Sequence, residues 1–577
     1  MVTIAYKKKR VLQVYSCVLA IIFMMIANSC TKCDLPQGES SAFFDTFTYV
    51  GNDDYYNNNP LTAPNQYYNP ILPGWNSDPS ICRRGNDYFL VTSSFVYYPG
   101  VPIFHSTDLI NWKQIGYVLN RESQLQNFSK QHTSGGIFAP AISYNPANKT
   151  FYMITTNVGA GNFYVKTTDP FSGNWSEPIY LPSVQGIDPS FFFDENGKAY
   201  IVNNDAPIVE PRYDGHRAIK IREFDVANDC TIGEEKVIVD GGIHPEENPV
   251  WIEGPHLYKI GGYYYLMAAE GGTSENHSEV ILRSLSPWGP FEVWKQNPIL
   301  TQRSLDPKRA NPITCAGHAD LIQTPQGDWW AVFLACRPID NEFENLGRET
   351  FLMPVRWNDD YPYITHGNEE VPMIVNKTNA IRGENTTFGN FSYTDNFDSD
   401  TLAIEWMTLR SSAQEHYSLT QNKGFLTLKC SNQLATQHTT PAFVCRRIQH
   451  HKFTCTTSMY LNLEDTTESA GMLLYKDEFH QYYMSVKKSL QCEDIIAVEK
   501  ISREGVTILA STPLKQCNAK ISLKVESDGR HFTFSYADKN GDWKQLITGV
   551  DARYLSTANS WGFTGTTIGL YATKEKK

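Results

Sequence analysis

The sequence predicts an all-β protein, in which a five-bladed β-propeller is followed by a β-sandwich. Three observations support this prediction. Aromatic residues make up 13% of the chain and long helical periodicity is scarce, which favours sheets. A unit of polar turn, apolar run, hairpin turn and aromatic-rich strand occurs five times before residue 350. Beyond it, short alternating strands continue without that repeat.

The N-terminus has the pattern of an export signal. Residues 7–10 (Lys-Lys-Lys-Arg) form a cationic start, and residues 17–27 are an apolar run that is too short to span a bilayer. Residues 1–29 are therefore expected to be a signal peptide. The small residues before Cys30 resemble a bacterial lipobox, which predicts lipidation of Cys30 and anchoring to a bacterial membrane, on the periplasmic or the cell-surface face. Residues 30–64 are rich in Ser, Asn, Asp and Tyr and are expected to be a tether.

The repeat is assigned to residues 65–375. Each unit contains a hairpin, with turns such as residues 195–197 (Glu-Asn-Gly) and 260–262 (Ile-Gly-Gly). Units of about 50 to 65 residues with roughly four strands each are typical of propeller blades. A β-helix needs much shorter repeats, and an α-solenoid needs helical periodicity that the sequence lacks. Five units therefore predict five blades.

The C-terminal part is expected to form a separate domain. Residues 376–392 are rich in Asn, Thr and Gly and predict a linker. Residues 393–577 contain short alternating segments such as 424–429 (Gly-Phe-Leu-Thr-Leu-Lys), which predict a β-sandwich.

Carboxylic residues stand where the repeat predicts the inner strands to begin. Asp78, Asp188 and Glu253 occupy these places in three units, and His318 stands there in the fifth. An aspartate before a proline usually makes only a turn. The inner strands of a propeller surround one axis, however, so their beginnings converge on one funnel. The repeat therefore predicts that these four side chains meet.

Such a group of acids suits the hydrolysis of a glycosidic bond. One carboxyl group must protonate the leaving oxygen while another attacks or activates a water. A third carboxylate raises the pKa of the acid by like-charge repulsion. Phe95 and Phe138 are candidate aromatic walls for a sugar, although each taken alone is more often a core residue. The sequence has no G-x-S-x-G, HExxH or phosphate-loop motif.

The charge of the chain restricts its partners. The formal net charge is −12, and removal of residues 1–29 would make it more negative. A chain this acidic is a poor ligand for phosphate backbones, so no nucleic-acid partner is expected. The expected partners are an oligosaccharide and, through the lipid, a membrane.

Three motifs resemble those of glycoside hydrolase family 43, specifically its β-xylosidase and α-L-arabinofuranosidase members. They are residues 69–80 around Asp78, residues 187–190 (Ile-Asp-Pro-Ser) and residues 252–256 (Ile-Glu-Gly-Pro-His). The resemblance covers about residues 65–577, including a concanavalin-like sandwich. It implies that Asp78 is the general base, that Asp188 tunes and orients the acid, and that Glu253 is the general acid.

The same resemblance implies further pocket residues. Phe95 matches a residue that lines the sugar pocket, and residues 317–320 and 346–350 match segments that supply His318 and Arg348 to sugar hydroxyls. Phe138 stands where many relatives carry a tryptophan. No cofactor is expected to be required, although some relatives hold a calcium ion near the residue that His318 matches.

The implied activity is an inverting, exo-acting hydrolysis that releases terminal xylose or L-arabinofuranose from hemicellulose such as xylan or arabinoxylan. Inversion requires the base and acid carboxyl groups to lie about 6.5–9.5 Å apart, which leaves room for a water. Two alternatives remain open at this point. One is an arabinan- or galactan-directed hydrolase of the same family, and the other is a non-catalytic carbohydrate-binding surface lipoprotein.

Overall fold

A computed structural model describes residues 39–488, 494–514, 520–538 and 541–575. The chain divides into a unit up to Ser40 and a unit from Ser41 to Lys577, and the second unit contains all the helices and strands that the structure describes. The predicted signal peptide and Cys30 lie outside the described residues. Among the helices that the structure describes, none is long and apolar enough to cross a membrane.

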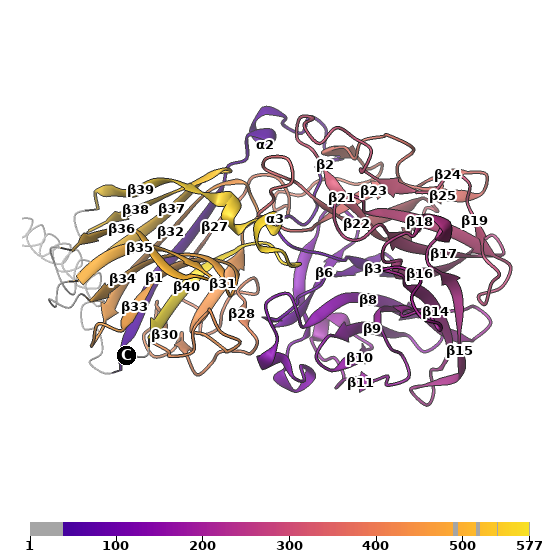
Figure 1. Cartoon of the computed structure of the whole chain (residues 1–577), viewed down its shortest axis with the longest axis horizontal. Helices are drawn as coiled ribbons and strands as arrows, with labels where there is room; N and C mark the ends of the chain where they lie inside the picture. The colour runs from indigo at the N-terminus through magenta and orange to yellow at the C-terminus, as the bar shows by residue number, and fades with distance from the viewer. Residues whose placement is uncertain (1–38, 489–493, 515–519, 539–540, 576–577) are drawn as a thin grey trace, which may run out of the picture. The chain divides into compact units, whose positions relative to one another are not determined.

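The predicted all-β fold with a five-bladed propeller is confirmed (Figure 1). Each blade is an antiparallel sheet built from consecutive strands. Blade one contains β3 (Ser80–Arg84), β4 (Asp87–Val91), β6 (Gly100–Ser106) and β7 (Lys113–Leu119), and blade two contains β8 (Ile137–Asn145), β9 (Thr150–Asn157), β10 (Gly161–Thr167) and β11 (Ile179–Tyr180). Blade three contains β12 (Ile187–Phe193), β13 (Ala199–Asp205), β14 (Ala218–Asp225) and β15 (Cys230–Asp240).

The last two blades complete a ring. Blade four contains β16 (Glu253–Ile260), β17 (Tyr263–Glu270), β18 (Ser278–Ser284), β19 (Glu292–Val293) and β20 (Leu300–Thr301), and blade five contains β21 (Thr314–Gln323), β22 (Trp329–Cys336) and β23 (Glu349–Pro354). The first strand of each blade touches the first strand of the next, and β21 touches β3 again. These five strands are therefore the inner strands around the axis.

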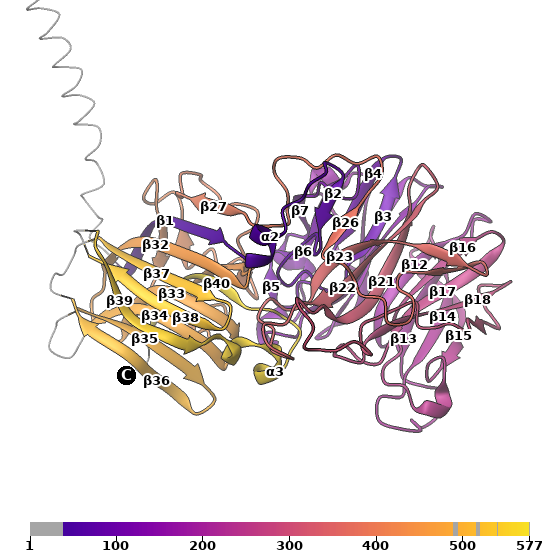
Figure 2. The ribbon, with the colours of Figure 1, turned by 90° about the horizontal axis from the view of Figure 1, so that it is seen from above.

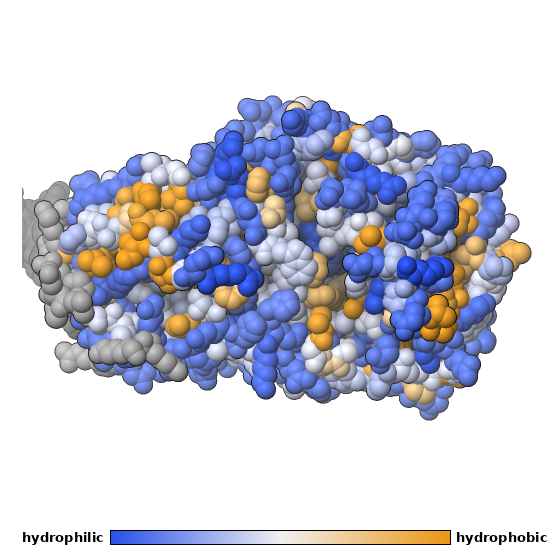
Figure 3. Space-filling model, in the orientation of Figure 1, coloured by the Kyte–Doolittle hydropathy of each residue, from blue (hydrophilic) through white to orange (hydrophobic). Residues whose placement is uncertain are grey.

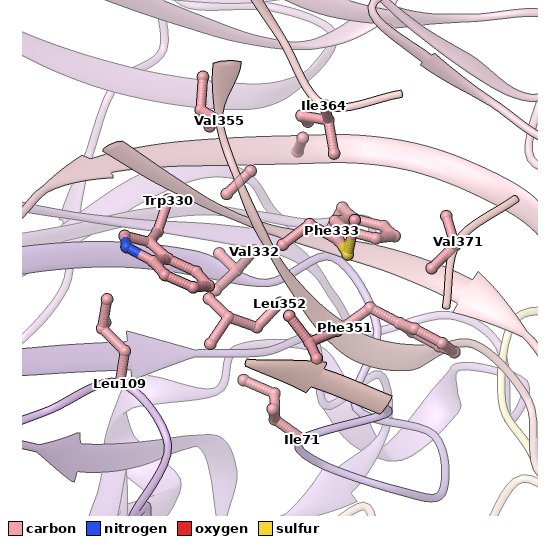
Figure 4. Packing of buried hydrophobic residues seen from close by; sticks show 14 of the residues in the cluster. Ile71, Leu109, Trp330, Val332, Phe333, Phe351, Leu352, Val355, Ile364 and Val371 are labelled. Carbon is pink, nitrogen blue, oxygen red and sulfur yellow. The ribbon is translucent and has the colours of Figure 1, made fainter. Parts of the chain in front are cut away.

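The two ends of the propeller segment join at blade five. The backbone N–H of Ile71 donates to the carbonyl of Thr350 in β23 at 2.9 Å, and β2 (Gln66–Tyr68) pairs with β26 (Ile374–Asn376). Ile71 packs in the same apolar core as Phe351 (Figure 4). Pairing the early segment with the last blade removes an open sheet edge, which closes the ring.

The remaining short elements lie between the strands of the blades or of the second β region. They are α2 (Asp54–Asn58), β5 (Tyr97–Tyr98), η1 (Glu122–Gln124), η2 (Phe128–Lys130), η3 (Pro170–Ser172), η4 (Pro245–Glu247), β24 (Arg356–Asn358), β25 (Tyr361–Tyr363), β28 (Thr408–Leu409), η5 (Ala552–Leu555) and α3 (Thr557–Ser560).

The inner strands share one irregularity near their start. The pairing of β8, β12, β16 and β21 with the next strand breaks there. In each blade a residue at this point adopts a positive φ: Asp78 (53°), Ala139 (31°), Asp188 (53°), Gly254 (56°) and His318 (51°). A residue outside the pairing is free to turn its side chain away from the pleat. The repeat thus places one such residue per blade at the axis.

The prediction that Asp78, Asp188 and Glu253 occupy equivalent positions in their blades is wrong for Glu253. Asp78 and Asp188 occupy the positive-φ position, but blade four has Gly254 there, and Glu253 precedes it by one residue. A side chain at Gly254 is excluded, because a Cβ atom there would lie 2.9 Å from the ring of His318. Glu253 therefore enters the site from a different backbone position than the two aspartates.

The second β region is the predicted sandwich, and Figure 2 shows its strands. One sheet contains β1 (Ser41–Gly51), β27 (Ser392–Asp395), β29 (Tyr417–Ser418), β30 (Leu426–Lys429), β32 (Lys452–Asn462), β37 (Ile521–Asp528), β38 (His531–Ala537) and β39 (Trp543–Asp551). The other contains β31 (Phe443–Arg447), β33 (Glu468–Asp477), β34 (His480–Lys488), β35 (Asp494–Ser502), β36 (Gly505–Pro513) and β40 (Thr567–Lys574). Their facing apolar side chains form one core.

The prediction that residues 30–64 form a tether is wrong from residue 41 onward. Strand β1 pairs with β32 along its length and also with β30 and β27. Its Phe44, Phe47 and Tyr49 side chains are fully buried in the sandwich core. The polar neighbours of this strand obscured its alternation, and its partners lie more than 300 residues away in the chain. The sandwich is thus built from two separated parts of the sequence.

The surface of this unit carries both hydrophilic and hydrophobic residues. On the face drawn in Figure 3, hydrophilic residues predominate and hydrophobic residues gather in separate patches, one of them over the sandwich strands. Exposed apolar side chains of that domain include Val506 and Ile508 in β36 and Trp543 in β39.

Candidate active site

A small cavity lies among the beginnings of the inner strands. It contains the predicted residues Asp78, Asp188 and His318, which come from three blades. The remaining lining residues come from the same strand starts and are Pro79, Ser80, Ala139, Pro140, Ala141, Pro189, Ser190, Gly254, Pro255 and His256. The structure therefore brings together residues that are up to 240 positions apart, as the repeat predicts.

Asp78 is a buried carboxylate that two distant groups hold in place. Its Oδ1 atom accepts a hydrogen bond from Arg348 Nη1 at 3.0 Å, and its Oδ2 atom accepts one from the hydroxyl of Ser93. The same Arg348 nitrogen donates to Thr273 Oγ1 at 2.9 Å, while Ser93 Oγ accepts from the backbone N–H of Ala139 at 2.8 Å. These contacts fix the orientation of the carboxylate, as a group that must hold a reacting water requires.

Asp188 is tied to the strand that carries the predicted acid. Its Oδ2 atom accepts a hydrogen bond from the backbone N–H of Gly254, the residue after Glu253, at 3.0 Å. Burial, and then the like charge of Asp78, raise the pKa of Asp188 to about 7. Asp188 therefore holds the beginning of β16 in place, and its ionisation depends on the charge of Asp78.

Glu253 has the electrostatic environment of a proton donor. Burial of its carboxyl group raises its pKa well above the ordinary value, and the like charges of Asp188 and Asp78 raise it further. Arg348 and Arg217 act in the opposite direction but are outweighed. A raised pKa favours the protonated form of the carboxyl group, which is the form that a general acid needs.

His318 contributes a neutral imidazole to the cavity. Burial lowers its pKa to about 4, so the ring is uncharged near neutral pH. Calcium prefers six to eight oxygen ligands. Among the described residues, no group of three or more His, Cys, Asp or Glu side chains is arranged to hold a metal ion.

The two predicted aromatic residues lie together, with a third that the sequence did not predict. The rings of Phe95 and Phe138 meet edge to face with centroids 5.8 Å apart. Phe563, from the sandwich, stacks on Phe95 at 6.3 Å and meets Phe138 edge to face at 5.5 Å. The guanidinium of Arg348 lies 5.2 Å from the centre of the Phe563 ring. An aromatic wall therefore stands beside the arginine that binds Asp78.

The sandwich also supports the segment that carries Arg348. The backbone N–H of Thr566 donates to the carbonyl of Asn345 at 2.8 Å, and that of Thr557 donates to the carbonyl of Glu344 at 3.3 Å. The sandwich residues that hold this loop lie close in sequence to Phe563. The position of Arg348 thus depends on both domains.

Three residues of this site were not predicted. Ser93 and Thr273 hold Asp78 and Arg348, but each lies in a loop without a chemical motif of its own. Phe563 follows an exposed tryptophan and a glycine near the end of the chain, and no spacing links it to the repeat. Its backbone N–H donates to Ser134 Oγ of the propeller at 2.9 Å. Only this tertiary contact reveals its place in the site.

The chain matches two known family models over most of its length. Residues 67–362 match the glycosyl hydrolases family 43, and residues 394–577 match the beta xylosidase C-terminal concanavalin A-like domain. The first match covers the five blades, and the second covers the sandwich except for β1.

Characterised relatives are similar over nearly the whole chain. A xylosidase/arabinosidase of Butyrivibrio fibrisolvens is 38% identical over 88% of this chain and 96% of its own length. A non-reducing end α-L-arabinofuranosidase of Bacteroides ovatus is 33% identical over 89% of this chain and 92% of its own. The crystal structure of a GH43_12 protein retrieved from the capybara gut metagenome is 42% identical, with a TM-score of 0.86, over 93% of this chain and 100% of the other.

Proposed function

Because the chain belongs to glycosyl hydrolase family 43, we propose that it is an exo-acting enzyme that releases terminal xylose or L-arabinofuranose from hemicellulose oligosaccharides. The protein is a glycoside hydrolase, as its family membership and its relatives indicate. The observation that carries the more specific proposal is that Asp78 and Asp188 line one cavity, while Glu253, next to the cavity residue Gly254, has a pKa that burial and the charges of both aspartates raise strongly. The printed names of the relatives, xylosidase, arabinosidase and arabinofuranosidase, support the choice of a pentose.

The proposed mechanism is a single displacement with inversion. Glu253 protonates the oxygen of the leaving group, because its raised pKa favours the protonated form. Asp78, oriented by Arg348 and Ser93, takes a proton from a water that attacks the opposite face of the sugar. Asp188 holds the backbone beside Glu253 and adds to the repulsion that raises the pKa of the acid.

The proposed sugar pocket combines charged and apolar groups. Arg348 and His318 are placed to bind hydroxyl groups of the terminal sugar, while the partly buried rings of Phe138 and Phe563, which pack on the buried Phe95, provide an apolar wall. Aromatic faces pack against the C–H groups of a pentose ring. A pocket bounded in this way by two domains suits one terminal sugar rather than the middle of a polysaccharide.

Turnover of two substrates tests this function. The wild-type protein is expected to hydrolyse nitrophenyl β-xyloside, nitrophenyl α-L-arabinofuranoside or both, and NMR of the first product should show the inverted anomer. Absence of turnover on every pentoside would contradict the proposed function. A product with retained configuration would contradict the role of Asp78 as a base.

The N-terminal sequence supports a further proposal about location. The cationic start, the apolar run and the small residues before Cys30 are typical of an exported lipoprotein, so the enzyme is proposed to be anchored to a bacterial membrane through Cys30. Labelling with radioactive palmitate and fractionation of membranes test it. Cys30→Ala is expected to abolish labelling and membrane attachment, whereas Cys33→Ala should leave both unchanged. Labelling of the Cys30→Ala protein would contradict the anchor.

A further inference from the structure

A second arginine lies on the side of the site that carries the acid. Arg217 directly precedes β14, and its positive charge acts on both Glu253 and Asp188. Its side chain is held in one orientation, because Nε and Nη2 donate to Asn204 Oδ1 at 3.1 and 2.9 Å. Among the described residues, Nη1 has no hydrogen-bond acceptor. One edge of a fixed guanidinium therefore remains for a ligand.

An exposed tryptophan forms the neighbouring surface. The guanidinium carbon of Arg217 lies 4.6 Å from the centre of the Trp251 ring. Trp251 is 37% exposed and precedes Glu253 by two residues. Its backbone adopts a positive φ of 50°, which is unfavourable for a bulky side chain, and its N–H donates to the carbonyl of Gly215 at 2.9 Å. The fold thus holds a partly exposed indole beside the acid.

One buried amide connects this surface to both carboxylic residues. Asn204 in β13 is fully buried and donates from Nδ2 to the carbonyl of Ile252, the residue before Glu253, at 2.6 Å. Asn204 also lies opposite Ile187, the residue before Asp188, in the pairing of β12 with β13. Strands β12, β13, β14 and β16 are all labelled in the same part of Figure 2. Arg217 and Trp251 are therefore fixed relative to the acid.

The chemistry of the reaction indicates which part of the substrate lies beside Glu253. A general acid protonates the bridging oxygen, so the leaving group must be next to Glu253. Sugar rings bind through stacking of C–H groups on an aromatic face and through hydrogen bonds from fixed donors. Trp251 supplies the first kind of contact and Arg217 the second. This pair is separate from the aromatic wall of Phe95, Phe138 and Phe563.

We propose that Trp251 and Arg217 form the leaving-group subsite, which binds the neutral sugar ring on the far side of the cleaved bond. A neutral ring is favoured over a uronic acid, because the carboxylate of Asp205 already acts on the charge of Arg217, and the carboxyl groups of Glu253 and Asp188 act on it as well. This inference rests on the proposed function. It adds that specificity for the leaving sugar comes from the loops before β14 and β16.

The experiment compares two substrates with the same terminal sugar. Xylobiose has a sugar as its leaving group, whereas trifluoroethyl β-xyloside leaves as a small alcohol without a ring. If the wild type releases only arabinofuranose, the matching arabinofuranosyl-xylose and trifluoroethyl arabinofuranoside replace them. Trp251→Ala and Arg217→Met are expected to lower kcat/KM for the disaccharide by about 10- to 100-fold, as loss of a stacking surface or a charged donor does. The trifluoroethyl substrate should change less than about threefold, because it makes neither contact.

Matched variants separate binding from structure. Trp251→Phe keeps a stacking face and should recover most of the disaccharide activity. Trp543→Ala removes a similarly exposed tryptophan in the sandwich, whose ring lies 4.9 Å from Lys524 Nζ, and should change neither substrate. Equal losses on both substrates would mean that the pair only positions Glu253 and would overturn the inference. So would unchanged disaccharide activity. Failure of the wild type on both substrates would instead overturn the proposed function on which the inference rests.

Discussion

The carboxylate of Asp188 accepts a hydrogen bond from the backbone N–H of Gly254 at 3.0 Å. This bond joins the break in inner strand β12 to the break in β16, directly beside Glu253. Glu253, the proposed acid, is therefore positioned through the backbone, and the charge of Asp188 also acts on its carboxyl group.

Asp188→Asn is expected to shift the pH dependence of catalysis. The substitution keeps an acceptor for Gly254 but removes a negative charge that raises the pKa of Glu253. The pKa of Glu253 should fall, so the loss of activity at high pH should begin at a lower pH, while kcat at the optimum falls by about 10- to 100-fold through poorer placement of the acid. The pH profile of kcat measures this. Asp229→Asn, which changes a partner of Lys166 and Tyr164, is the control, and an unshifted profile of Asp188→Asn would contradict the assignment.

The same variant is expected to be more stable than the wild type in alkaline solution. The pKa of Asp188 is raised to about 7 in the fold. An unfolded aspartate loses its proton near pH 4, so between about pH 4 and pH 7 the folded chain binds a proton that the unfolded chain has released. The free energy of unfolding of the wild type therefore falls as the pH rises from about 4 to about 7. Thermal unfolding at pH 8 should show a higher Tm for Asp188→Asn than for the wild type, with a smaller difference at pH 4.5. A Tm of Asp188→Asn below that of the wild type at pH 8 would show that ionisation of Asp188 does not destabilise the fold.

The two reacting carboxyl groups should respond differently to the leaving group. Glu253→Gln is expected to lower kcat/KM on xylobiose by about 10²- to 10⁴-fold, and by much less on a nitrophenyl glycoside that needs little protonation. Asp78→Asn should reduce both substrates strongly, because activation of the water is needed in each case. Steady-state kinetics on the two substrates distinguish these patterns. Identical patterns for the two variants would contradict the separate roles.

Phe563→Ala is expected to weaken binding of every pentoside. The substitution removes the ring that the sandwich places against Phe95 and Phe138. Aromatic contacts of this kind contribute about 0.5–1.5 kcal/mol, which corresponds to a rise in KM of about 2- to 13-fold. The Tm should change little, because the ring is only half-buried. Phe171→Ala, at an exposed phenylalanine that packs on Phe89 in blade one, is the control and should leave KM unchanged.

Phe47→Ala tests the role of β1 in the sandwich. Phe47 is fully buried in the core of that domain. Its truncation is expected to lower the free energy of unfolding by about 3–5 kcal/mol. Truncation of a residue in a solvent-exposed tether would not have this effect. Denaturant unfolding measures the loss, and Val50→Ala on the same strand, where Val50 is 40% exposed, should have little effect.

Much of the propeller and of its site was predictable from the sequence. The returning turns and strands indicate five blades, and propeller geometry then brings Asp78, Asp188 and His318 to one axis. The prediction was less accurate for Glu253. The repeat was aligned on its prolines, and their positions do not show which residue lies where the pairing of the inner strand is interrupted. The requirement for Gly254 depends on the ring of His318, which lies 64 positions further along the chain.

The sequence by itself determined the number of blades and the placement of Asp78, Asp188 and His318 at one axis, because these follow from local alternation and from a periodic fold, and its resemblance to family 43 indicated the class of chemistry. Only the tertiary structure decided that β1 belongs to the sandwich, that Phe563 reaches Phe95 and Phe138, and that Arg217 stacks on Trp251. Each of these contacts joins segments with no common period. Their formation depends on how apolar surfaces and hydrogen-bonding groups are paired in space once both domains are assembled.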